Sequence, residues 1–166
     1  MNSTVSTDLS KGILVKNLNL KSKFLNTDTV LMYKDVPALK NLPIEVVQGK
    51  FYSERVSSTL YNSPLYMAAV NADFTLKNNI LKIVNLSSEL YNGKMEGSVS
   101  YNLKDDNFSS NIASRGVSAA PIFDIVAIKK DSISGMMDFD ANISGNLLSR
   151  QSLNGNVKVI VHNGHM

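Results

Sequence analysis

The stretch that decides the fold is SSELYNGKMEGSVSYNL, residues 87–103. It places the pair Asn92-Gly93 between two runs in which apolar and polar residues alternate. An Asn-Gly pair favours a two-residue hairpin turn because both residues tolerate positive φ, and the alternation is typical of strands with one buried face. The sequence therefore predicts a β-hairpin with Asn92 and Gly93 as its structural turn.

The register of this hairpin follows from the predicted turn. If Asn92-Gly93 is the loop, Leu90 faces Met95, and one side of the hairpin is apolar or small while the other is polar. The same register sets Glu89 against Glu96, an unfavourable pair that requires a well-solvated face. The apolar side is expected to carry Val84, Leu86, Leu90, Met95, Val99 and Tyr101.

Period-2 alternation recurs along most of the chain. It predicts strands near the N-terminus and on both sides of the hairpin, several of them longer than the usual five or so residues. A turn at Asp105-Asp106-Asn107 separates the hairpin from the next strand. The expected apolar positions are Leu18, Leu20 and Phe24; Tyr66, Ala68, Val70, Ala72, Phe74 and Leu76; Phe108, Ser110 and Ile112; Ile133, Met137, Phe139, Ala141 and Ile143; and Leu153, Val157, Val159 and Val161.

One segment departs from this alternation. Residues 118–129, SAAPIFDIVAIK, have apolar residues at helical spacing, with Pro121 suited to a first turn and Ser118 to a cap. The fold class expected is mainly β: a long, curled antiparallel β-meander, a groove like a folded taco or a partial barrel, with one short helix. Residues 1-43 are expected to form an N-terminal strand and an irregular loop of the same module, and residues 44-166 the main sheet.

Composition excludes several function classes. The chain has 166 residues and no cysteine, which removes disulfide frameworks, thiolate metal sites and cysteine nucleophiles. Its net charge of +3, with 19% charged residues, is too weak and diffuse to indicate nucleic-acid binding. No stretch approaches the roughly 20 apolar residues that a membrane-spanning helix needs.

Polar candidates for catalysis or metal binding are few. His162 and His165 lie close together in sequence, but no third ligand accompanies them. Asp138 and Asp140 share one face of a predicted strand, where solvation explains them better than catalysis does. Because no nucleophile, base and orienting group can be assembled, the sequence predicts a protein that is not an enzyme, with no metal and no cofactor.

Four segments in order resemble the AsmA-like family of Gram-negative bacteria. LYNGKMEGSVSYNL, residues 90–103, resembles a hairpin of that family, with Asn92 where the family often has glycine. It is followed by GVSAAPIFDIVA, residues 116–127, by ISGMMDFDANISG, residues 133–145, and by SLNGNVKVIVHNG, residues 152–164. The resemblance covers about residues 44–166 and is more specific from Leu90 onward.

This resemblance implies a cell-envelope protein related to the TamB-type bridge-like proteins. The chain would be a periplasmic part of a protein anchored in the inner membrane, with the anchor outside this fragment. It would act in phospholipid transport and outer-membrane biogenesis, with phospholipid acyl chains, other envelope proteins or neighbouring modules as partners, and with self-association of the fragment. The β-sheet groove for lipid is expected to be lined by Leu86, Leu90, Val99, Tyr101, Met137, Phe139, Ile143, Val157 and Val159.

Two alternatives stay open at this point. The same apolar residues could simply pack as a closed core. The module could also be structural, binding other envelope proteins by pairing at a sheet edge and moving no lipid of its own.

Overall fold

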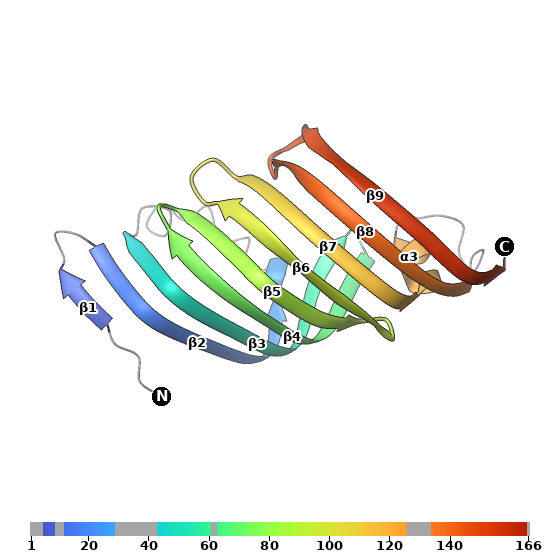
Figure 1. Ribbon diagram of the computed structural model, residues 1–166, viewed down its shortest axis with the longest axis horizontal. Coiled ribbons are helices and arrows are strands. Elements are labelled where there is room, and N and C mark those ends of the chain that lie inside the picture. The colour runs from blue at the N-terminus through green and yellow to red at the C-terminus, as the bar shows by residue number, and fades with distance from the viewer. Residues whose placement is uncertain (1–4, 9–11, 29–42, 61–62, 126–133, 166) are drawn as a thin grey trace.

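A computed structural model describes residues 5–8, 12–28, 43–60, 63–125 and 134–165. In this part of the chain, a single sheet has the strand order β1-β2-β3-β4-β5-β6-β7-β8-β9, and the helix α3 follows β7 (Figure 1). The elements are β1 Val5–Asp8, β2 Gly12–Asn26, β3 Ile44–Leu60, β4 Ser63–Lys77, β5 Ile80–Leu90, β6 Gly93–Asn102, β7 Asn107–Ser118, α3 Ala119–Ile125, β8 Ser134–Asn146 and β9 Ser149–His165.

The sheet is a meander with one parallel step. From β3 to β9 every neighbouring pair is antiparallel, which confirms the predicted consecutive sheet. β2 instead runs parallel to β3, with Leu18 beside Gly49 and Leu20 beside Phe51. A parallel pair needs a long connection, and the chain between Asn26 and Ile44 is long enough to supply it. The division at residue 43 stays a prediction, although β2 and β3 pair across it.

A bend shared by β2, β3 and β4 curls the sheet. The pairing of these strands skips Glu54 and Ala69, and Ala69 has a φ of 48°. Ser53 and Val56 are therefore both buried although they lie three residues apart, so β3 changes the face it presents to the interior. Beyond the bend the strands pass behind β5–β7, which gives the sheet a concave and a convex face (Figure 1). Tyr66, predicted on the apolar face, lies beyond this bend and is exposed.

The densest packing lies on the concave face at one end of the sheet. Leu90, Met95 and Val117 are buried together there, and α3 contributes Ile122 to the same cluster. The predicted helix is thereby confirmed over the part of residues 118–129 that the structure describes, whereas residues 126–129 lie outside it. The other side chains packed against the cluster are Leu65, Met67, Leu86, Tyr91, Ile112 and Phe139.

The β5–β6 hairpin forms with Asn92 in its turn as predicted, but Gly93 lies outside the turn and the predicted register is wrong. Tyr91 and Asn92 are the central turn residues, with φ of 43° and 71°, and Leu90 pairs with Gly93 rather than with Met95. This register places Glu89 opposite Lys94 and so avoids the like-charge pair that the predicted register imposes. The shift moves the pairing by two positions, so Leu86, Leu90 and Met95 keep their predicted face.

Gly93 has a packing role instead of a turn role. It begins β6 and lies under Val117, whose Cγ2 would be 2.6 Å from a Cβ at this position. Glycine is required here because the neighbouring strand approaches closely.

A β-bulge changes the outer part of the same hairpin. The pairing of β5 with β6 shifts between Ile83 and Leu86, and Asn85 within this gap has a φ of 51°. Ile83 therefore takes the place opposite Val99 that the unbroken alternation predicted for Leu86. Val84, predicted on the apolar face, is 43% exposed.

Candidate functional site

The concave face carries apolar side chains in rows that cross five strands. One row joins Leu86, Gly97, Ile112, Ala141 and Val157 through consecutive cross-strand pairs. The next row toward the β8–β9 turn joins Ile83, Val99, Ser110, Ile143 and Gly155. Since cross-strand neighbours on one face lie within van der Waals reach, these rows form one apolar surface from β5 to β9.

The predicted groove residues share this face but differ in access. Leu90 and Met137 are buried and belong to the packed core. Val157 and Val159, on the last strand, are 59% and 47% exposed. The half-buried remainder consists of Leu86, Val99, Tyr101, Phe139 and Ile143.

Tyr101 has a structural contact that the sequence did not indicate. Its hydroxyl donates a hydrogen bond to the carboxylate of Asp106, which is buried in the β6–β7 turn. Asp106 has a φ of 59°, a conformation that aspartate tolerates better than most residues do. Tyr101 therefore fastens this turn to the end of the concave face, in addition to contributing its ring to the apolar surface.

The cover of the concave face is uneven. Among the described residues, α3 lies over the end that holds Leu90 and Val117. Along β9, apolar side chains stay exposed to solvent. On β9 these are Leu153, Val157, Val159 and Val161. The far edge of β9 pairs with no other described strand, so the apolar surface reaches an open edge of the sheet.

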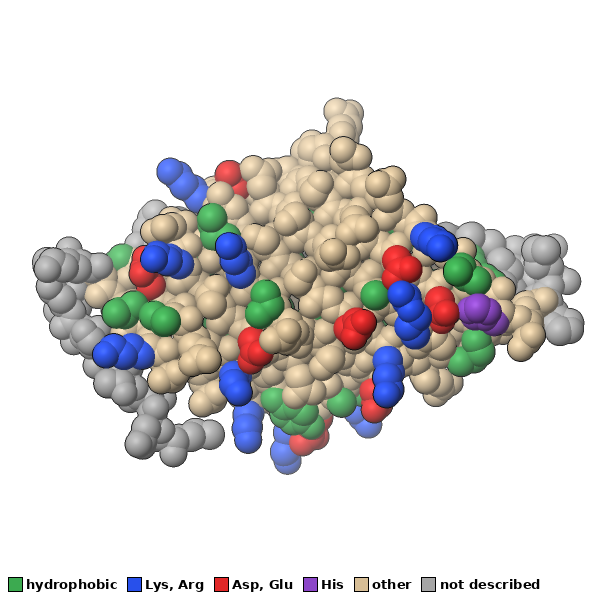
Figure 2. Space-filling model, in the orientation of Figure 1, with side chains coloured by type: hydrophobic (Ala, Val, Ile, Leu, Met, Phe, Trp, Pro, Cys, Tyr) green, Lys and Arg blue, Asp and Glu red, His purple; other side chains and the backbone are tan. Residues whose placement is uncertain are grey.

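The convex face is polar and carries a linked group of charges. Figure 2 looks onto this face and shows acidic and basic side chains spread over it, with a histidine near one end. Arg115 Nη2 lies 2.6 Å from Asp140 Oδ1. Asp138 accepts a hydrogen bond of 2.7 Å from the Gly116 amide, and its other oxygen lies 3.1 Å from His162 Nε2. First the Gly116 amide and then His162 hold the pKa of Asp138 below its ordinary value of 3.8.

These groups form a network of charges on the surface. Arg115 and Asp140 are about half exposed and neutralise each other. Within the described residues, no cluster of three or more histidine, cysteine, aspartate or glutamate side chains could hold a metal ion. The side chain of His165 lies outside the described part, so the predicted absence of a two-histidine site stays a prediction.

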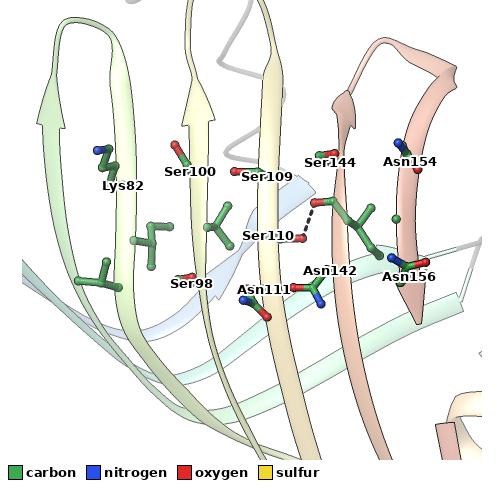
Figure 3. A pocket seen from close by; sticks show the side chains of 15 residues that line it. Lys82, Ser98, Ser100, Ser109, Ser110, Asn111, Asn142, Ser144, Asn154 and Asn156 are labelled. Atoms are coloured by element: carbon green, nitrogen blue, oxygen red, sulfur yellow. Dashed lines mark hydrogen bonds between the residues drawn. The ribbon is translucent and has the colours of Figure 1, made fainter. Parts of the chain in front are cut away.

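A shallow furrow of about 570 Å³ crosses β5–β9 between rows of polar side chains (Figure 3). One row is Lys82, Ser100, Ser109, Ser144 and Asn154, and the other is Ser98, Asn111, Asn142 and Asn156. Because neighbouring positions of a strand point to opposite faces, both rows belong to the convex side and the apolar row between them to the concave side. The furrow therefore offers amides and hydroxyls and is unsuited to acyl chains.

Comparison with known proteins yields no relative. No family model, curated protein or solved structure matches this chain. In the described residues, no helix combines the length and the apolar character needed to cross a bilayer.

Proposed function

We propose that this chain is a non-enzymatic module of an AsmA-like envelope protein, working in the periplasm as part of an inner-membrane-anchored chain. Its concave face would hold phospholipid acyl chains during their transport and so serve outer-membrane biogenesis. The observation that carries the proposal is the apolar surface that crosses β5–β9 and stays exposed on β9, at Val157 and Val159.

The energetics of such a surface suit passive lipid binding. Removing apolar area from water stabilises by about 25 cal/mol per Å², whatever the precise contacts. An acyl chain lying along this face would gain several kcal/mol without specific hydrogen bonds, by roughly 0.8 kcal/mol for each buried methylene. The hydroxyl and amide rows face the other way, and the hydroxyl of Ser110 on the concave face already donates a hydrogen bond to the Ile143 carbonyl oxygen.

The open edge of β9 favours a second candidate function. An unpaired edge offers free amide and carbonyl groups to a strand from another protein or from a neighbouring module. In this alternative the module is structural, and its apolar face is covered by protein rather than by lipid.

Site-specific photo-crosslinking separates the two candidates. A photoreactive amino acid replaces Val157 on the concave face or, as the matched control, Lys158 on the convex face of the same exposed strand. Each variant is illuminated with vesicles of phosphatidylethanolamine and phosphatidylglycerol, and adducts are identified by mass spectrometry. Lipid adducts at Val157 well above those at Lys158 are expected.

The position of Val157 makes this result specific. It lies roughly 30 Å along β9 from the β8–β9 turn, at about 3.3 Å per residue, so a bilayer that touched only that turn would not reach it. Equal labelling at the two positions, or protein adducts alone at Val157, would contradict lipid binding and support the structural alternative.

A further inference from the structure

Three turns form a continuous rim at one end of the sheet. They are the β4–β5 turn at Asn78 and Asn79, the β6–β7 turn at residues 103–106, and the β8–β9 turn at Leu147 and Leu148. In Figure 1 they follow one another along the upper side of the sheet, at the end away from α3. We call these three turns the turn rim.

Hydrogen bonds between turns hold the rim together. The Leu103 amide donates to Asn79 O over 2.8 Å, and the Leu147 amide donates to Asp106 O over 3.0 Å. The Asn146 side-chain amide also donates to Asp105 O over 2.5 Å. The tip of the β8–β9 hairpin is thus fixed to its neighbour rather than left as a loose loop.

The tip presents two leucines to solvent. Leu147 and Leu148 are 46% and 71% exposed, and they occupy the two central positions of a turn, where polar or small residues are usual. Apolar side chains held at a fixed tip raise the free energy of the protein in water. Their entry into an apolar phase would lower it.

Charge differs between the two ends of the sheet. Among the described side chains near the turn rim, Lys77, Lys82 and Lys104 are exposed cations and Asp105 is an exposed anion. Asp106 is buried, and its carboxylate accepts a hydrogen bond from the Tyr101 hydroxyl. The opposite end carries both signs: Glu89, Glu96, Asp124, Asp138 and Asp140 lie there together with Arg55, Lys94, Arg115 and Lys158.

We propose that the turn rim docks on the surface of an anionic phospholipid bilayer, with Leu147 and Leu148 inserted at the interface and Lys77, Lys82 and Lys104 facing lipid phosphates. Leucines set among lysines match an apolar layer bordered by negative charge, whereas the opposite end mixes acidic and basic side chains. This inference deepens the proposed function, because docking at the rim would set the end of the concave face against a source or acceptor of lipid.

Vesicle flotation tests the proposal. The full chain is floated with phosphatidylcholine vesicles and with vesicles that also contain phosphatidylglycerol. Leu147→Ser with Leu148→Ser should lower binding to both kinds about tenfold or more. Lys77→Gln with Lys104→Gln should lower binding about fivefold per lysine, and only to the anionic vesicles.

Matched controls lie at the other end of the sheet. Phe24→Ser removes an exposed apolar side chain from β2, and Lys94→Gln removes an exposed charge beside the β5–β6 turn. Both should float like the unchanged protein, and thermal unfolding should show that all variants are folded. Flotation unaffected by the leucine substitutions, or lowered equally by Phe24→Ser, would overturn the proposal.

Other outcomes separate this inference from the proposed function. A change in self-association of the leucine variant with unchanged flotation would assign the rim to a second copy and overturn bilayer docking. Leucine-dependent flotation without lipid adducts at Val157 would support docking while the lipid-groove proposal fails. Adducts at Val157 with detergent-dispersed phospholipid, without leucine-dependent flotation, would support the lipid-groove proposal and overturn bilayer docking.

Discussion

At the scale of single residues, Gly93 shows how packing replaced the role that the sequence indicated. The Asn-Gly pair predicted a turn, yet the positive φ values fall on Tyr91 and Asn92, one position earlier. Gly93 instead allows β7 to approach, because Val117 and the Arg115 carbonyl oxygen occupy the space that a Cβ would need. The missing side chain of Gly93 therefore allows close packing between neighbouring strands and does not serve to allow a positive φ in the turn.

Gly93→Ala should therefore destabilise the fold by about 1–3 kcal/mol, the usual cost of overpacking a tight contact. The new methyl group would meet Val117 Cγ2 and Arg115 O, each at 2.6 Å. Urea unfolding followed by circular dichroism measures the effect. Asn92→Gly is the control: it suits the positive φ and should change the midpoint little. Equal midpoints for Gly93→Ala and the unchanged protein would show that this contact is easily relieved.

At the scale of elements, bulges and bends decide which side chains share a face. β7 shifts register between Ser114 and Val117, and Gly116 within this bulge has a φ of 64°. The bulge leaves the Gly116 amide free of the ladder, and Asp138 of β8 accepts its hydrogen bond. His162 of β9 contacts the other oxygen of Asp138, so one carboxylate links three consecutive strands.

This linkage predicts a pH-dependent stability. Because the pKa of Asp138 is lower in the folded chain than its ordinary value of 3.8, its contribution is present above that value and is lost as pH falls through the folded pKa. Asp138→Asn should lower the urea midpoint at about pH 7, and the difference from the unchanged protein should shrink by about pH 2.5. Ser87→Ala, at an exposed position of β5, is the control. A difference independent of pH would mean that the charge of Asp138 contributes nothing.

At the scale of the whole molecule, the last strand of an open curled sheet exposes backbone hydrogen-bonding groups along its outer edge. No other described strand pairs with the outer edge of β9, and Val157 and Val159 are exposed on its concave side. Contiguous apolar surface beside a free edge promotes association when no ligand covers it. The isolated chain without lipid is therefore expected to self-associate through β9.

Val157→Lys with Val159→Lys should shift the lipid-free chain towards a monomer, as measured by light scattering after size-exclusion chromatography. Ile160→Lys is the matched control, since Ile160 is exposed on the convex side of the same strand. Thermal unfolding should change little in both variants because these side chains are already solvated. If Ile160→Lys dissociates the chain equally well, association depends on the edge rather than on the concave face.

The sequence by itself determined the local features: the long strands, the short helix after β7, the β5–β6 hairpin and an apolar face opposed to a polar one. These depend on residue alternation and on helical spacing, which neighbours along the chain impose. Tertiary structure alone decided the register of the hairpin, the burial of Leu90 and Met137, the exposure of Val84 and Tyr66, and the parallel step between β2 and β3. A bulge or bend exchanges the faces of every residue beyond it, and charge pairs such as Glu89 with Lys94 act only across strands. Which apolar residues pack and which remain open to a ligand therefore depended on how the whole sheet curls.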